Sequence, residues 1–193
     1  TDKVIEINDD IKTYLSNFKK GKYEIYESRQ IEFNKIKVIV FDFDEILIDK
    51  KIDECFDANN CWNFYPENKD GLAKILDKLK SKGKELFILS EYPIGKINEI
   101  LKGNKIPIET YSKENDSKQQ FKLHIKKISE LEEEKKKMEE IIYVSRNKEL
   151  NDIASKMGCC VPVVSIADNN KVGYKRLEVI FGEKDSLKIR KIE

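Results

Sequence analysis

From residue 37 onward, short runs rich in β-branched residues alternate with segments of helical spacing. The runs are almost continuously apolar, which is typical of strands covered on both faces. Strands that alternate with helices form βαβ units, and such units build a parallel sheet. We therefore expect a three-layer α/β sandwich around a mostly parallel five-stranded sheet. The predicted strands are residues 37–41, 85–89, 107–111, 141–144 and 160–166.

Helical spacing appears in three segments between these strands. Apolar residues recur at i, i+3, i+4 and i+7 from Leu72, and a similar pattern starts at Ile94. Gly83 and Gly103 provide the ends of these two helices. The third segment, residues 117–140, is mostly polar, and its run of glutamates and lysines predicts an exposed helix with ion pairs four residues apart.

The length of 193 residues suits one well-buried core plus an extension. Residues 1–35 fit the sheet poorly: Asn8 is a candidate cap for a short helix, and residues 23–33 alternate loosely, as in an edge strand or an arm. The predicted organisation is an N-terminal extension at 1–35, one α/β domain at 36–182, and a Lys-rich tail at 183–193 that is an arm or a frayed end.

Charge and cysteine usage narrow the classes of partner and compartment. The 37 basic residues nearly cancel the 36 acidic ones, so net charge does not support a nucleic-acid partner. No run of about 18 apolar residues predicts a membrane span. The four cysteines show no C-x-x-C spacing, which favours reduced thiols in a cytoplasmic or organelle-matrix protein. The chain begins at Thr1, so a targeting peptide cannot be assessed.

Two carboxylates follow directly on the first predicted strand. Asp42 and Asp44 stand two residues apart, so strand alternation puts both on one side at the carboxyl end, where α/β sheets bind ligands. Two acids in that position can divide the work of phosphoryl transfer: one attacks phosphorus and the other protonates the leaving oxygen. A pair of capping or loop aspartates is the alternative interpretation.

The order of motifs along the chain resembles the haloacid dehalogenase-like superfamily. After the D-x-D strand come a strand that ends at Ser90, a lysine before a helix in the KQQF segment at 118–121, and a fourth strand that leads into a loop and helix. In layout the chain is most similar to the capless magnesium-dependent phosphatases of that superfamily, over about residues 36–166. The resemblance implies a Rossmannoid sheet with strand order five-four-one-two-three and no folded lid, and Mg²⁺ as the cofactor of an active member.

The resemblance also implies roles for four residues. Asp42 matches the nucleophile and Asp44 the general acid, and both belong to the Mg²⁺ site. Ser90 matches the residue that hydrogen-bonds a phosphoryl oxygen, and Lys118 matches the lysine that neutralises the phosphoryl group. The alternative interpretations are a helix cap or turn residue for Ser90 and a solvated side chain for Lys118.

The sequence departs from the family pattern after the fourth strand. The family has acidic metal ligands at this place, but the chain has Ser145 and Arg146. A guanidinium aimed at this place would compete with Mg²⁺ for the two aspartates. Arg146 is therefore a candidate metal-replacing or anion-binding cation, and we expect it to hold Asp42 by a two-pronged contact.

Two further features bear on the metal. Ile46 replaces the small hydroxyl residue that usually follows the D-x-D motif, which removes a hydrogen-bonding side chain from the loop. Glu149 and Asp152 follow closely on Arg146, and a shifted loop that presents one of them to a metal stays open. Acidic residues that favour the dipole of a helix start are the alternative for these two.

These observations leave three functions. The first is a catalytically impaired phosphatase fold that acts as a scaffold or as a subunit of a larger assembly with protein partners. The second is an active Mg²⁺-dependent phosphomonoesterase. The third is a phosphate- or phosphopeptide-binding module that uses Ser90, Lys118 and Arg146 without hydrolysis and without a cofactor.

Overall fold

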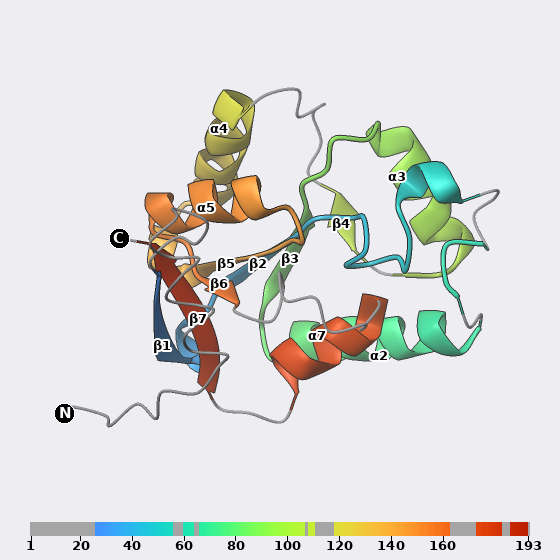
Figure 1. Ribbon diagram of the computed structural model, residues 1–193, viewed down its shortest axis with the longest axis horizontal. Helices are drawn as coiled ribbons and strands as arrows, with labels where there is room; N and C mark the ends of the chain where they lie inside the picture. The colour runs from blue at the N-terminus through green and yellow to red at the C-terminus, as the bar shows by residue number, and fades with distance from the viewer. Residues whose placement is uncertain are drawn as a thin grey trace, which may run out of the picture.

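The computed structural model describes residues 26–55, 60–63, 66–106, 108–110, 118–162, 173–182 and 186–192. A parallel sheet of four strands lies at its centre, in the order β4-β3-β2-β5 (Figure 1). These strands are β2 (Val38–Phe41), β3 (Glu85–Ile88), β4 (Glu109–Thr110) and β5 (Ile141–Val144). Each one lies within a run that the sequence pattern predicted as a strand.

The fifth predicted strand continues the sheet beyond β5. Cys160 forms a parallel bridge with Ile142 just before the short strand β6 (Val161–Pro162). The Cys160 N–H donates to the carbonyl of Ile141 at 2.8 Å, and the Tyr143 N–H donates to the carbonyl of Cys160 at 2.9 Å. The expected strand order is therefore confirmed, although residues 163–166 of the predicted strand lie outside the described residues.

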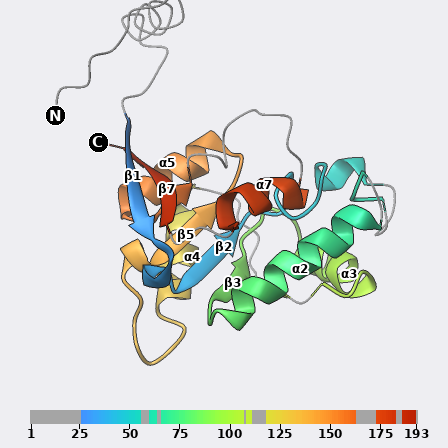
Figure 2. The same cartoon turned by 90° about the horizontal axis from the view of Figure 1, so that it is seen from below.

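Segments near the two ends of the chain pair beside β6. Strand β1 (Tyr26–Glu32) runs antiparallel to β7 (Ser186–Ile192), and β7 runs antiparallel to β6 (Figures 1 and 2). The structure thus has an edge strand within residues 23–33, and a strand within the segment predicted as a C-terminal tail. The helix predicted from Asn8 lies outside the described residues, and the domain boundaries stay a prediction.

Helices cover both faces of the parallel sheet. The four side chains of β2 point alternately to the two faces, and all four side chains are buried. On one face, Ile39 and Phe41 pack with α2 (Glu67–Ser81), α3 (Ile94–Gly103) and α7 (Gly173–Phe181). On the other face, Val38 and Val40 pack with α4 (Lys118–Ser129) and α5 (Lys148–Met157). This is the three-layer sandwich that the sequence predicted. Among the described residues, no helix has the length and apolar character needed to cross a membrane.

The long polar helix predicted at residues 117–140 is wrong in its second half. Helix α4 ends at Ser129, bends follow at residues 131–134, and a short 3-10 turn forms at Met138–Glu140. The buried apolar residues of α4 stop at Ile128, and Leu131 is 49% exposed. Ion pairs on a helix surface add only a few tenths of a kcal/mol each, so the Glu-Lys run has no packing to hold it helical.

The close contact between α2 and α7 yields a stability prediction. A Cβ added at Gly71 would lie 2.6 Å from the ring of buried Tyr174, whereas a Cβ at Gly95 in α3 would meet nothing within 4 Å. We expect Gly71→Ala to lower the free energy of unfolding by about 1–3 kcal/mol through overpacking. The control Gly95→Ala should raise it by about 0.5 kcal/mol, because alanine favours helices. Urea denaturation measures both, and an unchanged or raised stability for Gly71→Ala would contradict this packing.

Candidate functional site

A pocket of about 450 Å³ opens at the carboxyl ends of β2, β3 and β5. Four of the residues singled out from the sequence line it, because parallel strands end at one edge of the sheet. They are Asp42, Asp44, Ser90 and Arg146. The other lining residues come from the same three connections: Glu45, Lys51, Asp53, Glu91, Tyr92 and Asn147.

Asp42 is the most tightly held of these side chains. It follows β2, and its backbone N–H extends the sheet by donating to the carbonyl of Val144 at 2.9 Å. Its Oδ1 accepts the N–H of Phe43 at 2.7 Å, and its Oδ2 accepts the hydroxyl of Ser145 at 2.6 Å. Burial raises the pKa of Asp42 to about 7, although these two hydrogen bonds oppose the shift. The carboxyl group therefore changes protonation state near neutral pH.

Asp44 lies on a tight turn that begins directly after β2. Its Oδ1 accepts the N–H of Ile52 at 2.9 Å, which fixes the side chain against the turn at Ile52–Glu54. Burial is the main cause that raises the pKa of Asp44, and the charges of Asp53 and Glu45 add to it. A carboxyl group with a raised pKa suits a proton donor.

Ser145 contacts Asp42, and the sequence pattern did not predict this contact because the residue was treated only as a lost acid. The side chain is fully buried at the end of β5. Its hydroxyl donates to Asp42 and accepts the N–H of Asn147 at 2.9 Å, while its carbonyl accepts the Nδ2 of Asn151 at 2.7 Å. A small hydroxyl residue directly after the strand beside the D-x-D strand is the signal that points to it.

The expected two-pronged contact between Arg146 and Asp42 does not form. The guanidinium Nη1 lies 3.6 Å from Oε1 of Glu45 instead. Both oxygens of Asp42 already accept hydrogen bonds, and the backbone at Glu45 is left-handed, with a φ of 59°. A non-glycine residue at positive φ is uncommon, and this turn was not visible in the sequence pattern. The metal-replacing or anion-binding role of Arg146 stays a prediction.

The remaining candidates do not line the pocket in the part of the chain that the structure describes. Glu149 is exposed in the first turn of α5, and Asp152 lies 4.0 Å from Nζ of Lys148. Lys118 begins α4, but its side chain lies outside the described residues.

Ser90, which lines the pocket, is buried at the end of β3. Its Oγ accepts the N–H of Tyr92 at 3.2 Å, which leaves the hydroxyl proton available to donate.

The pocket offers only part of a metal site. Five carboxylates line it against Lys51 and Arg146, and this excess of negative charge attracts a cation. Within the described ranges, however, no three His, Cys, Asp or Glu side chains gather closely enough to hold a metal ion. Mg²⁺ is usually bound by one or two carboxylates, waters and phosphate. Asp42 and Asp44 could supply the carboxylates, and Ser145, directly after β5, brings a hydroxyl in place of a further acid.

No protein-family model matches the sequence, and no curated protein matches it. Solved structures share its architecture. A Bacteroides fragilis structure of an N-terminal part containing a phosphatase domain, complexed with Mg, matches with a TM-score of 0.54 and 14% identity, over 68% of this chain and 37% of that one. The chain has a haloacid dehalogenase-like fold. It thus spans little more than a third of that Bacteroides chain.

A second solved structure covers most of both chains. It is the cobalt-bound deoxy-D-mannose-octulosonate 8-phosphate phosphatase of Haemophilus influenzae, with a TM-score of 0.49 and 14% identity over 75% of this chain and 85% of that one. At 14% identity, the likeness to the Bacteroides fragilis structure concerns the fold. The resemblance read from the sequence is confirmed at that level.

The raised pKa of Asp42 predicts how stability depends on pH. Because the pKa in the folded state is about 7, against 3.8 for an ordinary aspartate, the folded chain binds this proton more tightly than the unfolded chain. The group's contribution to the free energy of unfolding is therefore full below about pH 4 and is lost as the pH rises through about 7. The upper limit of this loss is about 4 kcal/mol, and solvent access at the pocket reduces it.

Urea denaturation of the wild type and Asp42→Asn at pH 5 and pH 8, in metal-free buffer, tests this prediction. Asp42→Asn should gain stability relative to the wild type between the two pH values. Asp77→Asn, at an exposed position on α2, is the matched control. An equal pH dependence in the wild type and Asp42→Asn would contradict the raised pKa.

Proposed function

We propose that this chain is a catalytically impaired phosphatase-fold protein that acts as a scaffold or as a subunit of a larger assembly. The observation that carries the proposal is the 2.6 Å hydrogen bond from the buried Ser145 hydroxyl to Oδ2 of Asp42. A carboxylate that attacks phosphorus must be ionised and must present a free oxygen in line. Here the burial of Asp42 favours the neutral form, and both oxygens accept hydrogen bonds from the protein.

The charge balance of the pocket supports the same proposal. Phosphoryl transfer depends mostly on positioning and on cations that neutralise the phosphoryl oxygens. Five carboxylates line this pocket, and Arg146, one of its two cations, is paired with Glu45. A phosphoryl dianion is repelled by such a site unless a further cation enters with it. This balance also weighs against the phosphate-binding module, which would hold an anion without a metal.

An active Mg²⁺-dependent phosphomonoesterase is the second candidate, and the excess of carboxylates favours it. In that case Asp42 is the nucleophile, and Asp44, fixed by the Ile52 N–H, donates a proton to the leaving oxygen. The Ser90 hydroxyl donates to a phosphoryl oxygen. When bound, Mg²⁺ supplies positive charge beside Asp42, which lowers the pKa of that carboxyl. The impaired protein needs no cofactor.

The partner and the compartment belong to the proposal as well. A scaffold or subunit requires protein partners. The groove between α4, the 3-10 turn at Met138–Glu140 and the end of α5 is a candidate contact surface. All four cysteines of the chain are free thiols, and Cys61, Cys159 and Cys160 are buried. Free thiols support an intracellular, reducing compartment, cytoplasmic or organelle matrix.

Hydrolysis of an aryl phosphate, measured while Mg²⁺ is titrated in, tests the proposal. We expect the wild type to release no more phosphate than Asp42→Asn at any Mg²⁺ concentration. Ser145→Ala with Arg146→Asp frees Oδ2 of Asp42, removes a cation and adds an acid at the end of β5, so we expect this double variant to gain Mg²⁺-dependent activity. The same double variant with Asp42→Asn added is the matched control and should be silent. Mg²⁺-dependent turnover by the wild type that is lost in Asp42→Asn would contradict the proposal and support the phosphomonoesterase.

A further inference from the structure

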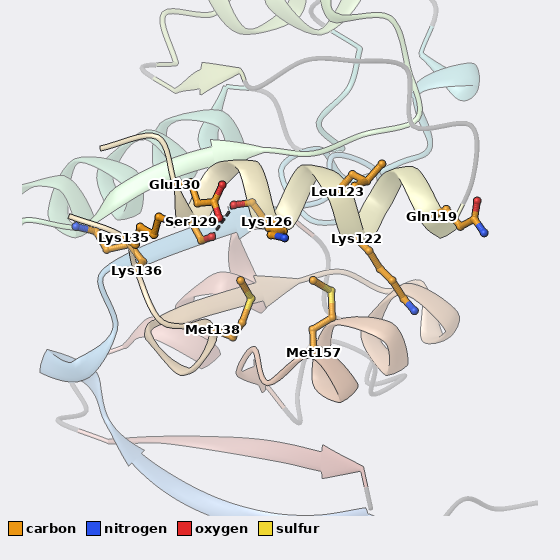
Figure 3. Close-up of a pocket in the computed structure, with 10 residues that line it drawn as sticks. All are labelled: Gln119, Lys122, Leu123, Lys126, Ser129, Glu130, Lys135, Lys136, Met138 and Met157. Atoms are coloured by element: carbon orange, nitrogen blue, oxygen red, sulfur yellow. Dashed lines mark hydrogen bonds and ion pairs between the residues drawn. The ribbon is translucent and has the colours of Figure 1, made fainter. Parts of the chain in front are cut away.

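A second pocket, of about 680 Å³, lies on the face of the sheet that α4 and α5 cover (Figure 3). It is a groove between α4, the 3-10 turn at Met138–Glu140 and the end of α5. Its lining residues on α4 follow helical spacing, for example at 119, 122, 123 and 126, and so form one stripe along the helix. Among the residues that the structure describes, none lines both this groove and the pocket around Asp42.

The floor of the groove is apolar and adaptable. Met138 and Met157 line it, and they are the only two methionines of the chain. Methionine side chains are flexible and polarisable, and they are common on surfaces that accept varied apolar partners. Leu123 also lines the groove and is 57% exposed, although it belongs to a helix whose opposite side is well packed. Exposed apolar residues that gather around a groove are typical of small contact sites.

The rim of the groove is basic. Four lysines and one glutamate line it, an excess of three positive charges on a chain whose net charge is +1. Lys135 lies 3.9 Å from Glu130, and Lys136 lies 3.3 Å from Glu132. Lys122 and Lys126 are exposed one turn apart on α4, and neither forms an ion pair with an acidic residue in the described part of the chain.

We propose that this groove binds an acidic amphipathic segment of a partner protein. The apolar side chains of the segment rest on Met138 and Met157, and its carboxylates pair with Lys122 and Lys126. An amphipathic helix laid into an apolar groove is a common mode of peptide recognition. The apolar floor favours a peptide over a nucleic acid, which brings no aliphatic side chains, and its concave shape disfavours a flat membrane surface.

The two methionines provide a direct readout. Chain labelled with ¹³C at the methionine methyl groups gives one signal from each native methionine, and Met138→Leu and Met157→Leu assign them. The probes are synthetic amphipathic peptides of about 20 residues, long enough to form helices, with leucine pairs at several helical spacings and glutamate elsewhere. A matched panel carries lysine in place of glutamate.

We expect both methyl signals to shift saturably with peptides of the acidic panel and not with the lysine panel. Lys122→Glu with Lys126→Glu should weaken binding at least about tenfold, because charge pairs at the rim become repulsive. The control Lys74→Glu with Lys80→Glu makes the same charge change at exposed positions of α2, on the other face of the sheet, and should bind as the wild type does. Circular dichroism melting checks that both double variants stay folded.

Several outcomes would overturn the proposal. One is that no acidic peptide shifts the methyl signals at millimolar concentration. Another is that the shifts persist unchanged in Lys122→Glu with Lys126→Glu. If dilution of the protein alone shifts the signals, the groove binds a second copy of the chain. Decanoate is a further probe, and shifts that only this fatty acid causes would assign the groove to an acyl chain. None of these results depends on whether the pocket at Asp42 is catalytic.

Discussion

Strand β2 lies between β3 and β5, and its four side chains are fully buried. The helices on both faces pack against it, so the two halves of the core depend on this one strand. Its hydrogen bonds continue past the strand end: the Leu89 N–H donates to the carbonyl of Phe41, and the Asp42 N–H donates to that of Val144, each at 2.9 Å. The backbone that carries Asp42, Ser90 and Ser145 is therefore held by the same ladder that holds the core.

This rigid edge gives the pocket its chemical character. The backbone of Asp42 cannot move away from that of Ser145 without breaking the sheet, because both residues directly follow paired strands. Burial and nearby acids raise the pKa of Asp42, and the positive charge that could counter them is turned toward Glu45. The site thus keeps the two aspartates of a phosphatase fold while the described residues around them supply little positive charge. A divalent cation would change that balance more than any single side chain.

The sequence predicted the parts of this structure that depend on local pattern. Continuous apolar runs located the parallel strands, and the position of Asp42 and Asp44 after one of them placed the pocket at the sheet edge. The pairing of β1 with β7 joins residues far apart in the chain, and strand register over such separations is set by tertiary packing. Helix α4 ends at Ser129 because its buried apolar residues stop at Ile128. The Glu-Lys pattern continues evenly past this point, so it did not predict the end of the helix.

Within the site, residue types were predictable but their hydrogen-bond partners were not. The contact of Arg146 with Glu45 depends on a left-handed turn at Glu45, and the contact of Ser145 with Asp42 depends on side-chain rotamers at two strand ends. Sequence reasoning assigned the charge of Arg146 to Asp42 because both residues follow neighbouring strands. The hydroxyl of Ser145 donates to Asp42 instead.

We infer that Asp42 does not form an aspartyl phosphate in this protein. Beryllium fluoride with Mg²⁺ mimics that species by binding a free, ionised aspartate, and ¹⁹F NMR detects the bound fluorides. We expect no bound fluoride signal for the wild type at pH 7 with saturating Mg²⁺. A bound signal in the wild type that disappears in Asp42→Asn would contradict it, because it would show that the nucleophile is free and that the pocket accepts both the metal and the phosphoryl mimic.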